Sequence, residues 1–213
     1  MTDTRNYQET HKKLLESGLR LFLDTDFEMA SVRQICKLAG VTTGAFYKHF
    51  KTKEDLIEEL VEPHLIQFKK IYDKEFNSFL NESKARNLSL EKYWRQNDGE
   101  LDPFIEYMYL HQDITNLVLF KAAGSKYDNI LERVTLFSEK QTIEAIGELK
   151  KYGLVDPEVV IKIENIHFFT YSFYATVYDI LMHGYSIEKT KEIISRLYLF
   201  FTPAWLEYLK IKK

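Results

Sequence analysis

Residues 42–53, Thr-Thr-Gly-Ala-Phe-Tyr-Lys-His-Phe-Lys-Thr-Lys, combine side chains that suit contact with phosphate groups. Thr42 and Thr43 offer hydroxyls and, at the start of a helix, free backbone N–H groups. Gly44 leaves the backbone bare, which permits close approach of a second molecule. Three lysines without an acidic residue among them add positive charge. These residues predict binding to the phosphates and base edges of a nucleic acid.

Three side chains of this segment and one of the preceding helix have more specific roles in the predicted surface. Tyr47 has an apolar ring for packing and a phenol that can reach a phosphate, and His49 can hydrogen-bond a phosphate or a base edge. Lys53 stands at the start of the next helix, where a phosphate would meet the positive end of the helix dipole. Arg33 lies on the polar side of the preceding helix. The aromatic residues Phe46 and Phe50 are assigned instead to a small core.

Local helix signals place this segment within a group of short helices. Apolar residues repeat at helical spacing over residues 15–23 and form one stripe. Ser31 and Gln34 have the form of a capping box that opens a second helix, and Gly40 is placed to end it. Thr42 then caps a third helix that runs to about His49. Two short helices joined by a tight turn are typical of a helix-turn-helix motif.

The block Ala39-Gly40-Val41-Thr42-Thr43-Gly44-Ala45-Phe46-Tyr47-Lys48-His49-Phe50, followed by Lys53-Glu54-Asp55-Leu56, resembles the TetR family of bacterial transcription regulators. The resemblance extends over residues 19–60 and implies a DNA-binding domain. Asp26, Gln34 and Cys36 depart from the family pattern, but none of them removes a DNA-facing group. The DNA-binding residues expected from the motif are Arg33, Thr42, Thr43, Gly44, Ala45, Tyr47, Lys48, His49 and Lys53.

The charge distribution agrees with this expectation but does not establish it. Residues 1–53 hold nine Lys/Arg and six Asp/Glu, a balance of +3, whereas the rest of the chain holds 20 and 26, a balance of −6. On charge alone, the lysines would more often form a solvated surface. The glycine, threonines and tyrosine around them favour DNA. The alternatives are a helical interaction module that binds protein, or an activator with no ligand-controlled release.

The residue types that support catalysis do not occur at catalytic spacings. The six histidines form no pair at i, i+4 with an acidic partner, and no Gly-rich phosphate loop or G-x-S-x-G motif occurs. We therefore predict a protein that is not an enzyme, with no metal and no cofactor. The polar N-terminus and the absence of a long apolar run predict no membrane association. The single cysteine, Cys36, suits the cytoplasm and a buried apolar position.

The rest of the chain predicts helices only. Eight glycines and four prolines are few for this length, and the helix-opening residues include Thr52, Asp102, Ser125, Asp156 and Ser186. A further short helix is expected over residues 88–96, and Pro63 is expected to kink or split the helix that follows Thr52. The predicted fold is all-α with about nine helices. It consists of a three-helix helix-turn-helix domain at 1–53 and a larger helical ligand-binding and dimerisation domain at 54–213.

Two aromatic helices near the C-terminus are expected to pair with their copies. The family resemblance implies that the last two helices form a homodimer, and their large apolar faces are compatible with this. A helix-turn-helix protein normally binds a two-fold site with two copies, which favours an interface over an intramolecular core. The predicted interface residues are Phe168, Tyr174, Tyr178, Leu197 and Phe201.

The resemblance also implies a ligand pocket among the middle helices. Tyr107 and His111 would share one face of a helix over residues 102–119, with Trp94, Phe120 and Tyr171 converging on them. Aromatic residues at helical spacing more often make core, so simple packing is the competing interpretation. Such walls would suit a small apolar or aromatic ligand. The overall prediction is a repressor that binds a palindromic operator in double-stranded DNA and is released by this ligand.

Overall fold

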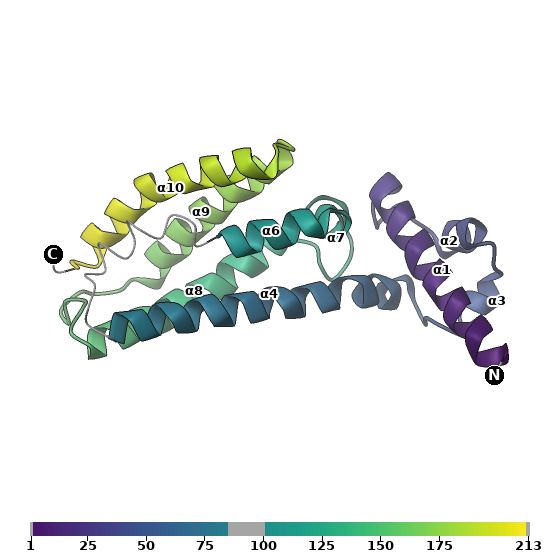
Figure 1. Ribbon diagram of the computed structural model, residues 1–213, viewed down its shortest axis with the longest axis horizontal. Coiled ribbons are helices and arrows are strands. Elements are labelled where there is room, and N and C mark those ends of the chain that lie inside the picture. The colour runs from purple at the N-terminus through teal and green to yellow at the C-terminus, as the bar shows by residue number, and fades with distance from the viewer. Residues whose placement is uncertain (1, 85–100, 212–213) are drawn as a thin grey trace. The chain divides into compact units, whose positions relative to one another are not determined.

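The computed structural model describes residues 2–84 and 101–211 (Figure 1). Within these two ranges the regular structure consists of nine α-helices and one π-helix, with no strand. The prediction of an all-α fold is confirmed. The short helix expected over residues 88–96 lies outside the described residues.

The described chain forms two compact units, each made from separate stretches of sequence. The first comprises Met1–Phe68 and Leu110–Ile130, and the second comprises Lys69–Tyr109 and Leu131–Lys213. The predicted boundary between residues 53 and 54 stays a prediction, because compactness alone does not show which segment folds independently.

Three helices open the first unit: α1 (Thr2–Thr25), α2 (Val32–Ala39) and α3 (Thr43–Phe46). Asp26 follows α1 and has the left-handed conformation, with φ 71°, that is typical of a residue at the end of a helix. Ser31 and Gln34 form the predicted capping box before α2. Together with the turn up to Thr52, these helices are called the N-terminal head below.

Helix α4 (Lys53–Lys84) begins at a second reciprocal cap. The Thr52 N–H donates to Asp55 Oδ2 at 2.9 Å, and the Asp55 N–H donates to Thr52 Oγ1 at 3.2 Å. The helix passes through Pro63 without ending, so of the two predicted outcomes, a kink or a split, the split is wrong. Proline removes one hydrogen bond, and the apolar side chains of Leu56, Ile57 and Val61 hold this part of α4 in the core.

The core of the first unit joins three stretches that lie far apart in the sequence. Leu14, Phe22 and Phe46 come from the N-terminal head and are fully buried. They lie in one cluster with Leu56, Ile57 and Val61 of α4, and with Leu117, Ala122 and Tyr127. The head therefore shares its hydrophobic core with residues 117–127.

The segment after residue 110 differs from the single helix expected over residues 102–119. Helix α6 (Asp102–Leu110) ends before His111, and α7 (Gln112–Asn116) leads into the π-helix η1 (Leu117–Lys121). His111 has φ −117° and ψ 46°, outside the helical region, so it interrupts the helix. As a result, Tyr107 and His111 do not share one continuous helix face, and that prediction is wrong.

Helices α8 (Ile130–Lys151), α9 (Ile163–Met182) and α10 (Ile187–Tyr208) form most of the second unit, with α6 and the end of α4. Both α8 and α9 begin later than the caps at Ser125 and Asp156 predicted. The Ser125 hydroxyl donates to the Ala122 carbonyl, and Asn129 takes a left-handed conformation, so residues 122–129 form a loop. Before α9, the Lys150 ammonium donates hydrogen bonds to the carbonyls of Pro157 and Val159, and these two residues are not helical.

Candidate nucleic-acid interface

The turn between α2 and α3 is built by residues with defined backbone roles. Ser31 Oγ accepts from the Gln34 N–H at 3.3 Å, and Gln34 Oε1 accepts from the Ser31 N–H at 2.9 Å. Gly40 has φ 68°, a conformation that favours glycine, and its N–H reaches back to the end of α2. Thr42 Oγ1 then accepts from the Ala45 N–H at 3.1 Å and starts α3. The predicted helix-turn-helix geometry is thus present.

The polar residues of α3 and its flanks face solvent, whereas its aromatic residues divide between two roles. Phe46 and Phe50 are buried in the core, as predicted. Tyr47 is 60% exposed and its ring stands edge-on to Phe46. The other predicted DNA-facing residues that are exposed are Arg33, Thr42, Thr43, Gly44 and Lys48, and Ala45 and His49 are half-buried.

Gly44 is not required by the packing of the chain itself. A Cβ atom at this position would meet the Thr42 Oγ1 atom at 3.8 Å, which is ordinary van der Waals contact, and its φ is not positive. At Gly18, by contrast, internal packing favours glycine, because a Cβ there would lie 2.5 Å from a methyl group of Leu56. The bare surface at Gly44 is therefore available to another molecule and has no internal role in packing.

His49 is held in place by residues of α1. Its ring centroid lies 4.0 Å from that of Tyr7, and its Nδ1 atom lies 3.3 Å from Nδ1 of His11. Burial lowers the pKa of His49, with a smaller contribution from the facing His11. The Tyr7 hydroxyl also donates to the Lys48 carbonyl at 3.4 Å. Sequence spacing gave no signal for these α1 contacts, because Tyr7 and His11 lie about 40 positions before their partners.

Lys53 is placed differently from the prediction. Its ammonium donates to the carbonyls of Phe27, at 2.5 Å, and of Ala30, at 2.8 Å, and it lies 4.1 Å from the centroid of the Phe27 ring. Burial lowers the pKa of this lysine. Because its donors point to the loop between α1 and α2, this geometry does not support the predicted phosphate contact of Lys53.

We expect the substitution Lys53→Met to destabilise the N-terminal head. The methionine keeps the apolar stem but leaves the carbonyls of Phe27 and Ala30 without their donor, at a cost of about 1–2 kcal/mol. Urea unfolding measures this loss. The matched substitution at the exposed Lys51 should change the free energy of unfolding little. Equal stability of the two variants would contradict the assignment of Lys53.

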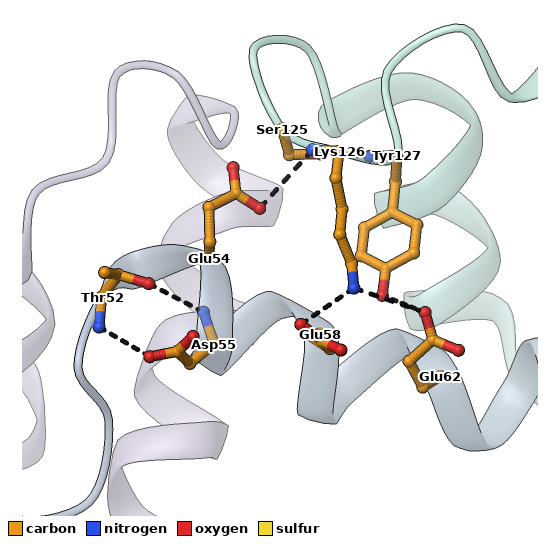
Figure 2. A network of polar contacts seen from close by, with 8 residues as sticks. All are labelled: Thr52, Glu54, Asp55, Glu58, Glu62, Ser125, Lys126 and Tyr127. Carbon is orange, nitrogen blue, oxygen red and sulfur yellow. Dashed lines mark hydrogen bonds and ion pairs between the residues drawn. The ribbon is translucent and has the colours of Figure 1, made fainter.

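Polar contacts fasten the loop after η1 to the first turns of α4 (Figure 2). Lys126 lies 2.8 Å from Glu58 Oε2 and 3.6 Å from Glu62 Oε1, and its backbone N–H points to Glu54. The buried Tyr127 donates its hydroxyl to Glu62 Oε1 at 2.7 Å. At the end of η1, Lys121 pairs with Asp26 at 2.7 Å. Residues 121–127 thus contact both α4 and the N-terminal head.

The described residues that were predicted to line a ligand pocket belong to both compact units. His111 and Phe120 belong to the first compact unit, where the ring of His111 stands edge-on to that of His64 with centroids 4.8 Å apart. Tyr107 and Tyr171 belong to the second unit, and Tyr171 stacks on His167. Trp94 lies outside the described residues. The pocket stays a prediction.

The residues predicted at the dimer interface differ in exposure. Phe168 is 62% exposed on α9, whereas Leu197 packs into a core cluster and Phe201 stands edge-on to Phe173. Tyr174 accepts a hydrogen bond from Ser138, and burial raises the pKa of Tyr178. Leu199 and Phe200 on α10 are 74% and 76% exposed, more than the five residues of the predicted interface. They occupy the helix face opposite the buried Ile194 and Thr202, a signal that the helical spacing contained.

Comparisons with known proteins agree with the motif. Residues 14–60 match the family described as bacterial regulatory proteins, tetR family. The HTH-type transcriptional regulator AcrR of Shigella flexneri is 47% identical over 55 residues, which are 26% of this chain and 26% of that protein. The HTH-type transcriptional repressor KstR2 of Mycolicibacterium smegmatis is 36% identical over 53 residues, 25% and 26% of the two chains. The chain thus aligns with only about a quarter of these relatives' length.

Solved structures extend the likeness to the whole fold. A TetR family transcriptional regulator from Chloroflexus aurantiacus has a TM-score of 0.57 at 14% identity, over 92% of this chain and 93% of that one. The regulator FadR from Bacillus subtilis, solved in complex with stearoyl-CoA, has a TM-score of 0.53 at 12% identity, over 88% and 96%. The resemblance found in the sequence is confirmed: residues 14–60 match the TetR family, and the chain shares its fold with a solved TetR family transcriptional regulator. Among the described residues, no helix has the length and apolar character for crossing a bilayer.

Proposed function

We propose that the chain is a cytoplasmic, non-enzymatic repressor that binds a palindromic operator in double-stranded DNA as a homodimer and is released by a small apolar or aromatic ligand. The observation that carries the DNA-binding part is the exposed surface of Thr42, Thr43, Gly44, Tyr47 and Lys48 within the segment that matches the TetR family. Arg33, Ala45 and His49 complete the proposed DNA-facing set. Hydroxyls, a bare backbone and a cation suit phosphate and base-edge contacts.

Exposed apolar residues support the proposed homodimer. Helices α9 and α10 pack on each other, and Phe168, Leu199 and Phe200 leave large apolar side chains in solvent in the single chain. A second copy that covered these side chains would remove their apolar area from water. A two-fold dimer would set its two heads about one turn of DNA apart, roughly 34–36 Å.

Shared core residues support the proposed release by a ligand. Residues 117–127 belong to the core of the N-terminal head and pair with Asp26 and with α4. A ligand that favours another position of this segment would therefore alter the head. FadR is an example of a regulator of this fold solved with a small molecule, stearoyl-CoA. Thermodynamic linkage requires that DNA weaken ligand binding by the same factor by which the ligand weakens DNA binding.

Salt dependence of DNA affinity tests this function. A duplex is first selected from a random library by the wild-type chain, and its affinity is then measured between 50 and 200 mM salt. Each phosphate contact contributes about −0.9 to the slope of log affinity against log salt. We expect Lys48→Ala to reduce the slope by about 0.9 per head, because one phosphate contact is lost.

The matched control is Lys69→Ala, since Lys69 is an exposed lysine paired with Asp73 on α4. It should leave both affinity and salt slope unchanged. Failure of the wild-type chain to select any duplex, or an affinity that is flat in salt, would instead support a helical module that binds protein.

A further inference from the structure

Three ionisable side chains form a hydrogen-bonded line at the N-terminal head. Glu59 Oε1 on α4 lies 2.5 Å from His11 Nε2 on α1. On its other side, His11 Nδ1 lies 3.3 Å from His49 Nδ1, in the turn after α3. Tyr7 packs on His49, and Phe50 packs on His11. The positive charge of Lys48 is a further influence that lowers the pKa of His49. Residues from α1, α4 and the turn thus fix both imidazole rings.

The partners of these rings determine where their hydrogens lie. A carboxylate only accepts hydrogen bonds, so His11 carries a hydrogen on the Nε2 atom that faces Glu59. When both rings are neutral, Nδ1 of His11 is therefore bare, and the hydrogen between the two rings belongs to His49 Nδ1. Nε2 of His49 is then also bare. A bare nitrogen and a phosphate oxygen are both acceptors, so the neutral pair cannot hydrogen-bond the DNA backbone.

One additional proton changes the chemistry of His49. It gives either His11 or His49 hydrogens on both ring nitrogens, while one hydrogen still bridges the two Nδ1 atoms. In both arrangements Nε2 of His49 carries a hydrogen that it can donate. The added charge lies between the Glu59 carboxylate and the place where a phosphate would bind. Proton uptake and phosphate contact therefore favour each other.

We propose that His11 is a positioning residue for a DNA backbone contact by His49: the line Glu59–His11–His49 takes up one proton when the head binds DNA, and Nε2 of His49 becomes a donor to phosphate. This inference rests on the proposed DNA-binding function. In the free chain, burial and the facing His11 lower the pKa of His49, so this ring is neutral near pH 7 before binding. A nearby phosphate would raise that pKa. Because the bound state holds more protons, affinity must rise as the pH falls.

The experiment measures affinity for a duplex selected by the wild-type chain, at constant ionic strength, from pH 8 to pH 6. For the wild-type chain we expect an affinity that increases as pH falls, by at most about tenfold per pH unit for each proton taken up by one head. Calorimetry in two buffers with different heats of ionisation counts the same protons. The H49N variant should bind more weakly, and its pH profile should be flatter.

An asparagine in place of His11 distinguishes a positioning role of this residue from a role in packing alone. In His11→Asn an amide stands near the position of Nδ1 and can donate to His49 Nδ1 without taking up a proton, so we expect retained binding with a flatter pH profile. Glu59→Gln should shift the rise in affinity to lower pH, because the countercharge is lost. His183→Asn, on an exposed histidine whose Nδ1 faces the Asp179 carbonyl, is the control and should keep the wild-type profile.

The possible results distinguish this inference from the function on which it rests. If His11 serves only to pack α1, His11→Asn should lower the melting temperature and leave the pH slope as in the wild-type chain, which overturns the proposal. Tight binding by the wild-type chain with no pH dependence overturns the proposal and leaves DNA binding intact. A wild-type chain that selects no duplex overturns both.

Discussion

The substitution Gly44→Leu is expected to reduce affinity for a selected operator by at least about 100-fold, or roughly 2.7 kcal/mol. A leucine side chain on the exposed surface of α3 would hold the backbone away from DNA and break several phosphate and base contacts together. The fold should survive, because a Cβ at this position meets only the Thr42 hydroxyl, at 3.8 Å. Stability should be equal or slightly higher, since glycine within a helix is unfavourable.

Fluorescence anisotropy with the selected duplex measures the loss, and thermal unfolding of the same sample checks the fold. Gly147→Ala is a suitable control, because a Cβ there meets no atom within 4 Å and the residue lies on α8. It should bind DNA as the wild-type chain does. Wild-type affinity in Gly44→Leu would show that another surface faces DNA.

The largest effect on stability is expected from Tyr127→Ala. Tyr127 is fully buried in the core cluster of the N-terminal head, and its hydroxyl donates to Glu62 at 2.7 Å. Truncation of a large buried aromatic residue costs about 3–5 kcal/mol. Tyr127→Phe removes only the hydrogen bond and should cost about 1 kcal/mol. The difference between the two variants separates packing from hydrogen bonding.

Hydrogen exchange shows where the stability is lost. Because Tyr127 shares a core with Phe22 and Phe46, amides of α1 and α2 should exchange faster in Tyr127→Ala. Tyr185→Ala is the control, since its ring is 40% exposed and lies in the other compact unit. If α1 and α2 kept wild-type protection in Tyr127→Ala, the head would be stable without residues 117–127. The predicted boundary after residue 53 would then gain support.

Features of the head that depend on near neighbours in the chain could be predicted from the sequence. The capping boxes at Ser31 and Thr52 each close within three residues, and Gly40 needs only its own backbone conformation. The buried positions of Phe46 and Phe50 follow from helical spacing. The family motif located the exposed surface of α3, because that surface is continuous in sequence.

Features that depend on distant neighbours could not be predicted in this way. Lys53 reaches carbonyls more than 20 positions earlier, and Tyr127 reaches Glu62 across 65 positions. The cap expected at Ser125 failed for the same reason, because contacts of the loop with α4 compete with an early helix start. Spacing along one helix carries no information about such partners.

Burial of Cys36 makes the chain well suited to site-directed spin labelling. It is the only cysteine in the sequence, it is 3% exposed, and burial raises its thiol pKa, so little reactive thiolate is present. A cysteine introduced at the exposed Lys51 would therefore be the single site that accepts a nitroxide. Pulsed electron paramagnetic resonance on such a sample would report the separation between the two heads of the proposed dimer directly, with and without DNA or candidate effectors.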